Sequence, residues 1–133
     1  MFPLLFIQIT GIEIMWNAHK AVVFARNHAG LHSQKRCAEF VSNAIRAGGA
    51  NLHNTHYAKD MESNLILAGF RQVHGEPIEG DVAVIQATAH HQYGHACIYD
   101  GNGVWYSDFV QRTMYPGPEY REVKPAYAIY RHE

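Results

Sequence analysis

Residues 37–49 read Cys-Ala-Glu-Phe-Val-Ser-Asn-Ala-Ile-Arg-Ala-Gly-Gly, a stretch that predicts an amphipathic helix beginning at a cysteine and ending at a glycine pair. Val41 and Ala44 mark the buried face of this helix. Cys37 shares that face, so its side chain is expected to point toward the protein interior, where a strand would lie. Unpaired backbone N–H groups and the helix dipole favour thiolate over thiol at this end of a helix. The sequence therefore predicts an activated cysteine.

A second informative stretch, at residues 94–101, reads Gly-His-Ala-Cys-Ile-Tyr-Asp-Gly and alternates like a strand. Its end overlaps the turn sequence Asp-Gly-Asn-Gly at residues 100–103, in which glycine and asparagine tolerate a positive φ. Residues 95–99 and 104–109 are therefore expected to pair as a β-hairpin.

Three side chains from these segments form a candidate catalytic set. His95 opens its strand and could accept the proton of Cys37, while Asp108 on the hairpin partner could hold the imidazole in one orientation. Ser107 faces the opposite way in a regular strand, so only one of these two neighbours can take that part unless a bulge intervenes. Cys97 lies mid-strand, without a helix dipole to activate it, and is predicted to be an inert core thiol.

The spacing of apolar residues also indicates how the remaining chain folds. It predicts two more helices, at residues 18–29 and 57–68, and two more strands, at residues 82–86 and 127–131. Prolines at both ends of residues 116–118 predict an irregular segment there. We therefore expect an α+β fold in which N-terminal helices pack on an antiparallel sheet, with residues 1–133 forming a single domain.

The first 15 residues allow two interpretations. Residues 4–9 could form a first strand, or residues 1–15 could be a nonessential extension ahead of a natural start near Met15. The apolar opening lacks the basic region and the small-residue cleavage site of a signal peptide. It is also too short to span a membrane, and no membrane span is expected.

The charge and composition of the chain exclude some classes of function. The 133 residues contain 11 Lys and Arg against 12 Asp and Glu, so the chain lacks the excess basic charge with which most nucleic-acid-binding proteins contact phosphates. We expect no nucleic-acid partner, and we expect a monomer. The ten histidines would make the surface cationic in mild acid.

The histidines also raise the possibility of a zinc site. His90, His91 and His95 could supply three ligands, with a fourth from His74 or Asp108. The spacing argues against this reading, because adjacent histidines in a loop diverge and no Cys pair or His-Glu-x-x-His pattern accompanies them. We therefore expect neither a metal nor another cofactor. Residues 90–93 are instead expected to form a polar rim that either binds substrate or faces solvent.

Several stretches together resemble a known enzyme group. They are Cys-Ala-Glu-Phe-Val at residues 37–41, Gly-Asp-Val-Ala-Val-Ile at 80–85 and the 94–101 motif, and they look like the CHAP and NlpC-type branch of the papain-like superfamily. Trp-Tyr-Ser-Asp-Phe-Val-Gln-Arg at residues 105–112, Pro-Gly-Pro-Glu-Tyr at 116–120 and Ala-Tyr-Ala-Ile-Tyr-Arg at 126–131 are similar to small type VI secretion amidase effectors and their phage or plasmid relatives. The resemblance covers about residues 16–131.

This resemblance implies a papain-like fold and a cysteine hydrolase of bacterial peptidoglycan. Cys37 matches the nucleophile and His95 the base, and Asp108 takes roughly the third polar place, where NlpC-type enzymes usually have histidine. The Cys37 N–H and one donor from residues 33–36 are expected to bind the oxyanion. The expected substrate-binding residues are Arg36, His91, Tyr93 and Trp105.

The resemblance further implies a biological setting and leaves alternatives open. A wall hydrolase made in the cytoplasm without a signal peptide would act in the periplasm or cell wall after delivery by a secretion apparatus or after lysis. An antibacterial effector of this kind would have a cognate immunity protein as partner. The sequence does not choose between the D-glutamyl–diaminopimelate bond and the cross-bridge. A catalytically silent papain-like module that binds wall peptides or a partner protein is the second hypothesis.

Overall fold

The structure is a computed structural model that describes residues 15–133, so the expectations for residues 1–14 lie outside the described part. Helices come first along the chain: α2 (Ala18–His28), α3 (Cys37–Ala47), the 3₁₀ turn η1 (Ala58–Asp60) and α4 (Glu62–Leu67). Strands follow, interrupted by one helix: β1 (Phe70–Val73), β2 (Val82–Ile85), β3 (His95–Tyr99), β4 (Trp105–Tyr106), β5 (Val110–Gln111), α5 (Pro118–Val123) and β6 (Tyr127–His132). No helix within this part is long and apolar enough to cross a membrane.

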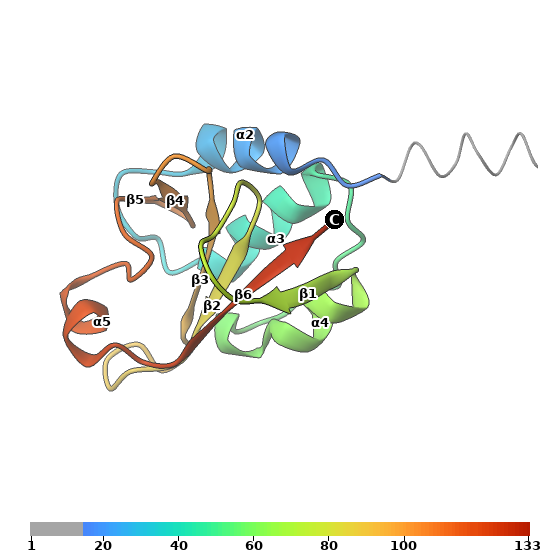
Figure 1. The fold of residues 1–133 in the computed structure, drawn as a ribbon. Helices are drawn as coiled ribbons and strands as arrows, with labels where there is room; N and C mark the ends of the chain where they lie inside the picture. The colour runs from blue at the N-terminus through green and yellow to red at the C-terminus, as the bar shows by residue number, and fades with distance from the viewer. Residues whose placement is uncertain (1–14) are drawn as a thin grey trace, which may run out of the picture.

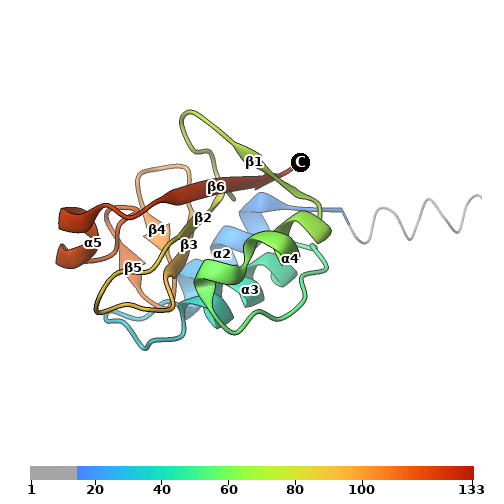
Figure 2. The same cartoon turned by 90° about the horizontal axis from the view of Figure 1, so that it is seen from below.

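The six strands form one sheet in the order β1-β6-β2-β3-β4-β5, and every neighbouring pair is antiparallel. Helices α2, α3 and α4 lie on one side of this sheet, and α5 lies apart from them, near the start of β6 (Figures 1 and 2). The predicted α+β fold, with N-terminal helices packed on an antiparallel sheet, is confirmed.

Both faces of the sheet are apolar, which explains why its central strands are buried throughout. On the helix side, Val84 and Ala96 pack in a cluster with Val41 and Ala44 of α3. On the other side, Ile85, Cys97, Trp105 and Ile129 form a second cluster, which Tyr120 of α5 joins. The sheet is thus covered by long helices on one face and by the chain around α5 on the other, so neither face needs polar residues.

Element boundaries differ from the prediction where local chemistry interrupts a pattern. The predicted helix over residues 57–68 is divided into η1 and α4. Pro118 was expected in an irregular segment but begins α5, because the first turn of a helix needs no N–H from its first residue. The expected strand over residues 104–109 ends at Tyr106, and the chain turns before β5 begins at Val110.

Gly94 sets the point at which β3 begins. Its φ of +73° lies in the left-handed region, and a Cβ atom there would lie 2.4 Å from the backbone oxygen of Ile85. Only glycine fits both the conformation and the contact. The next residue, His95, pairs with Ile85 at the end of β2, so the histidine is held at the edge of the sheet core.

Candidate active site

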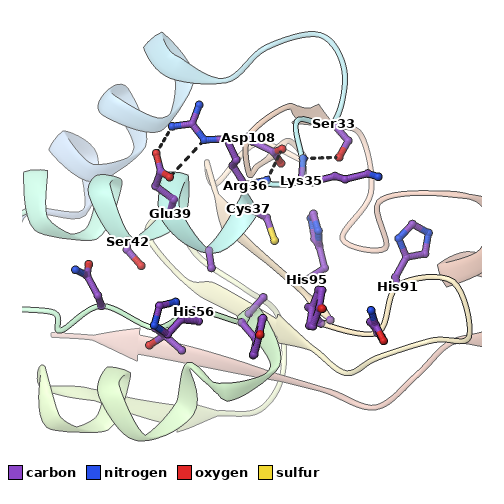
Figure 3. Close-up of a pocket in the computed structure, with 18 of the residues that line it drawn as sticks. Ser33, Lys35, Arg36, Cys37, Glu39, Ser42, His56, His91, His95 and Asp108 are labelled. Carbon is purple, nitrogen blue, oxygen red and sulfur yellow. Dashed lines mark hydrogen bonds and ion pairs between the residues drawn. The ribbon is translucent and has the colours of Figure 1, made fainter.

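A cavity of about 850 Å³ opens at the N-terminus of α3, and both Cys37 and His95 line it. The side chains of these two residues project into the cavity from opposite elements, α3 and β3 (Figure 3). Cys37 packs against the cluster that contains Ala96, the residue after His95, and the backbone N–H of Ala96 acts to lower the pKa of the thiol. The structure therefore brings the predicted thiol to the strand that carries the predicted base.

Two opposing effects act on the pKa of the Cys37 thiol. Burial raises its pKa above the ordinary cysteine value, and the nearby Asp108 carboxylate acts in the same direction. The backbone N–H groups of Ala96, Ala38 and Cys37 itself lower the pKa by stabilising the thiolate, but burial outweighs them. The resting form is consequently the thiol, and the helix-terminal N–H groups act as a stabilising environment for charge that develops during reaction.

His95 is also buried, with 7% of its surface exposed. Burial lowers its pKa below the ordinary histidine value, although the bond to Gln111 and the Asp108 charge both work against this shift. The imidazole is therefore neutral at neutral pH, which is the form that can accept a proton from a thiol.

Gln111 of β5 determines which ring nitrogen is free. Its Oε1 lies 2.8 Å from His95 Nε2, and its amide nitrogen donates to the backbone oxygens of Thr113 at 3.1 Å and Met114 at 3.0 Å. These two carbonyls accept only, so the amide oxygen must face the imidazole and Nε2 must carry the hydrogen. Nδ1 is left unprotonated and available as the base. Gln111 is not predictable as a site residue from the sequence, because nothing in a two-residue strand signals where its side chain points.

Asp108 does not occupy the orienting position expected from the sequence. Its Oδ2 accepts the backbone N–H groups of Gln34 at 2.5 Å and Arg36 at 3.1 Å, and the hydrogen-bond partner of His95 is Gln111. Because the chain turns after β4, this carboxylate reaches the loop that precedes α3. Lys35, between the two donors, has a φ of 59°, so Asp108 holds a left-handed turn directly ahead of the nucleophile.

This arrangement also changes the expected oxyanion site. The N–H groups of Gln34 and Arg36 are occupied by Asp108, and Lys35 N donates to Ser33 Oγ at 3.3 Å. The expectation that residues 33–36 supply the second donor is therefore wrong for these three groups, whereas the N–H of Cys37, at the first position of α3, has no carbonyl partner within the helix.

Comparison with known proteins decides the family. No family model and no curated protein matches the chain, but solved structures do. One is the type VI native effector–immunity complex Tae3–Tai3 from Ralstonia pickettii, with 44% identity, a TM-score of 0.86, and coverage of 89% of this chain and 100% of the matched chain. The chain belongs to the Tae3 family. The selenomethionine form of the same complex matches with 46% identity, a TM-score of 0.81, and coverage of 84% and 98%. The resemblance to small type VI amidase effectors is thus confirmed.

Three of the four expected substrate-binding residues line the cavity of this Tae3-family chain: Arg36, His91 and Tyr93. Tyr93 stacks on Tyr57 at a centroid distance of 4.2 Å, so an exposed aromatic pair joins two loops of the rim. Trp105 is placed elsewhere, because it is 6% exposed and packs in the cluster on the far face of the sheet. Its position does not support substrate binding.

The rim histidines His90 and His91 each contact a side chain of α5 and do not converge on one common site. His90 bonds to the Glu119 carboxylate at the start of α5 through its backbone N–H, at 3.1 Å, and through its ring Nδ1, which ties the rim loop to that helix. Within residues 15–133, no group of three or more His, Cys, Asp or Glu side chains is arranged to hold a metal ion.

The pKa shifts of the Tae3-family site predict how alkylation depends on pH. Because burial raises the pKa of Cys37 above its ordinary value, the rate of its reaction with iodoacetamide should rise by about tenfold per pH unit between pH 7 and 8 and should continue to rise above pH 8. A preformed thiolate–imidazolium pair would instead give a rate that is already flat near pH 6. The measurement is the alkylation rate by mass spectrometry, and a plateau below pH 7 would contradict the burial argument.

Removing the Gln111 side chain tests whether it orients His95. Gln111→Ala leaves Nε2 without its partner and allows the ring to rotate or to change tautomer, so kcat of the hydrolysis proposed below should fall by about ten- to a hundredfold. The conservative variant Gln111→Asn, whose side chain is too short, should not restore it, whereas Gln111→Glu keeps an acceptor and should restore part. Equal rates for all four proteins would exclude an orienting role.

Proposed function

We propose that this chain is a cysteine amidase that hydrolyses amide bonds in the peptide part of bacterial peptidoglycan. The observation that carries the proposal is the shared cavity of Cys37 and His95, with the tautomer of the imidazole set by Gln111. Membership of the Tae3 family supports it, because the matched structure is a type VI effector.

The chemistry is acyl transfer through a thioester. Nδ1 of neutral His95 takes the thiol proton as the sulfur attacks the amide carbonyl, and a C–S bond forms while the carbonyl oxygen becomes an oxyanion. Collapse of this intermediate breaks the C–N bond, and the imidazolium returns its proton to the leaving amine. A water, deprotonated by His95, then attacks the thioester, which releases the carboxylate and restores the thiol.

Tyr120 is the proposed second donor for the oxyanion, beside the N–H of Cys37. Its side chain lines the cavity, its hydroxyl is buried, and no partner for it exists among residues 15–133. Burial raises the pKa of this phenol, so it remains an O–H donor. Tyr120→Phe should lower kcat by tenfold or more with KM and the alkylation rate of Cys37 little changed. An unchanged kcat would remove Tyr120 from the mechanism.

The direct test uses purified peptidoglycan and the wild-type protein. Mass spectrometry of the muropeptides should show new free amino groups paired with new carboxylates, and the masses identify which bond is cut. Iodoacetamide should abolish the reaction and a chelator should not, whereas a zinc hydrolase would respond in the opposite way. Binding to peptidoglycan without any new amino group would instead establish the silent binding module.

We further propose that the chain is a type VI effector that acts in the periplasm of a target cell and is blocked by an immunity protein. The support is the effector–immunity complex in which the related Tae3 was crystallised. Export of this chain to the periplasm of a bacterial test strain should cause lysis, and co-export of a cognate immunity protein should prevent it. Growth without lysis despite detectable periplasmic protein would count against this role.

A further inference from the structure

The cavity continues past the thiol along the side of α3. Ala38, Ser42 and Arg46 all line it, and their spacing of four residues places them in one row on the helix. The opposite wall is formed by residues 54–58. Figure 3 shows Ser42 and His56 on one side of Cys37 and His91 on the other, so the thiol lies between two arms of one groove. We call the part between α3 and residues 54–58 the α3 arm.

Arg46 is a fixed cation at the far end of this arm. Its guanidinium donates to the backbone oxygen of Leu52 at 2.9 Å, to Asn43 Oδ1 at 3.1 Å and to Asn54 Oδ1. These bonds use three of the five N–H groups of arginine and leave two for a ligand. No carboxylate within residues 15–133 forms an ion pair with Arg46, so its charge is held in place without being neutralised.

Ser42, midway along the arm, provides a second and independent observation. Its side chain is 3% exposed and lines the cavity, yet its hydroxyl has no hydrogen-bond partner in the described part of the chain. A buried hydroxyl without a partner is uncommon, and a bound molecule would supply the missing bond.

The distance along the helix indicates the length of the ligand. Arg46 is nine residues after Cys37, which corresponds to about 14 Å along the axis. Three to four residues of extended peptide span roughly this distance. Long helical side chains lean toward the N-terminus, which brings the guanidinium closer to the thiol.

We propose that the α3 arm binds a short peptide limb of the substrate that carries a free carboxylate, with Arg46 pairing with that carboxylate and Ser42 bonding to the backbone of the limb. This inference rests on the proposed function. Such a site makes the enzyme selective for acidic peptides, because an uncharged peptide limb would leave the Arg46 guanidinium in the groove without a partner.

The test compares two preparations of the same peptidoglycan. One is untreated, and in the other the carboxylates are converted to amides with carbodiimide and ammonia. Wild-type protein should hydrolyse the untreated material with a kcat/KM about tenfold or more above that of the amidated material. In Arg46→Gln the ratio of the two values should fall to near one. The alkylation rate of Cys37 reports whether the variant keeps an intact site.

Each outcome separates this inference from the function on which it rests. Equal hydrolysis of both preparations by the wild-type protein overturns the carboxylate site and leaves the amidase standing. Hydrolysis of neither preparation overturns the amidase itself. A wild-type preference that persists undiminished in Arg46→Gln assigns the selectivity to another residue and overturns the role of Arg46.

Discussion

Replacing Cys37 with alanine should reduce the hydrolysis of peptidoglycan by at least about a thousandfold, whereas the same replacement at Cys97 should leave the rate within about threefold. The two cysteines make a matched pair, since the chemical change is identical and both thiols are free. Cys37 lines the cavity beside His95. Cys97 is fully buried on the other face of the sheet, where burial raises its pKa so far that it remains a thiol.

The size of the loss expected for Cys37→Ala follows from the proposed chemistry. Without a sulfur no thioester forms, and only the binding of substrate and the oxyanion donors remain. Binding of peptidoglycan by Cys37→Ala should therefore survive, which a co-sedimentation assay measures. The rate is followed by the release of new amino groups. Hydrolysis by Cys37→Ala at the wild-type rate would exclude covalent catalysis by this residue, and loss of activity in Cys97→Ala with an unchanged fold would mean that the wrong thiol has been chosen.

The sequence alone is sufficient to predict those parts of the site that depend on a single helix or strand. Cys37 begins a helix whose apolar residues repeat every three to four positions, and His95 begins a strand that alternates; each of these patterns is local. The fold class follows from the same patterns, because helices in the first half and strands in the second leave little choice but helices on a sheet. The hairpin of β3 and β4 is likewise confirmed at its Asp-Gly-Asn-Gly turn.

The supporting residues could not be assigned in this way, because their positions depend on where a strand ends. A strand that continued through residues 104–109 would keep Asp108 in line with the imidazole. The strand instead ends at Tyr106, and after the turn Gln111 occupies the place beside His95 while Asp108 contacts the loop before α3. Both positions are taken by buried polar residues, so residue type alone does not show which of the two contacts the imidazole. The position of Trp105 could not be predicted for the same reason, because the face of the sheet to which its side chain points depends on how its strand pairs with its neighbours.

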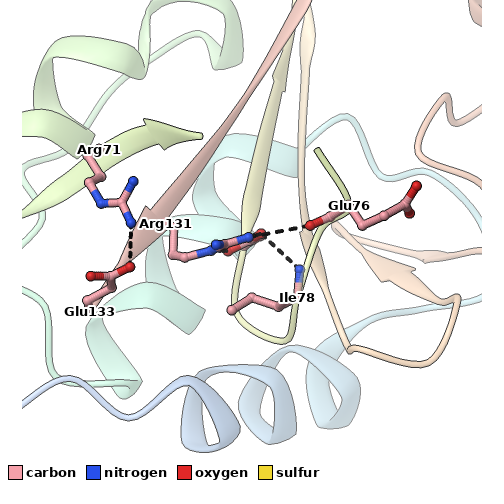
Figure 4. A network of polar contacts seen from close by, with 6 residues as sticks. Arg71, Glu76, Ile78, Arg131 and Glu133 are labelled. Atoms are coloured by element: carbon pink, nitrogen blue, oxygen red, sulfur yellow. Dashed lines mark hydrogen bonds and ion pairs between the residues drawn. The ribbon is translucent and has the colours of Figure 1, made fainter. Parts of the chain in front are cut away.

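Stability should depend most strongly on a carboxylate at the opposite end of the sheet. Asp81 is fully buried, and its carboxylate accepts Nε and Nη2 of Arg131 at 2.9 Å and 2.8 Å and the backbone N–H of Ile78 at 2.9 Å. Figure 4 shows the Arg131 and Ile78 side of this network, with the Arg71–Glu133 pair beside it. Asp81→Ala leaves the guanidinium of Arg131 without a counter-charge in a site where only 20% of its side chain is exposed. The free energy of unfolding should therefore fall by about 3–5 kcal/mol.

A matched control lies in the same network. Arg71 and Glu133 form an ion pair in which both side chains are more than half exposed, so Arg71→Ala should cost less than about 1 kcal/mol. Urea unfolding followed by tryptophan fluorescence measures both values. Asp81 directly precedes β2, whereas His95 pairs with Ile85 at the far end of that strand, so the folded fraction of Asp81→Ala should retain the wild-type kcat/KM. If Asp81→Ala costs no more than Arg71→Ala, or if it loses activity while still folded, the carboxylate does not act as a remote clamp on the sheet.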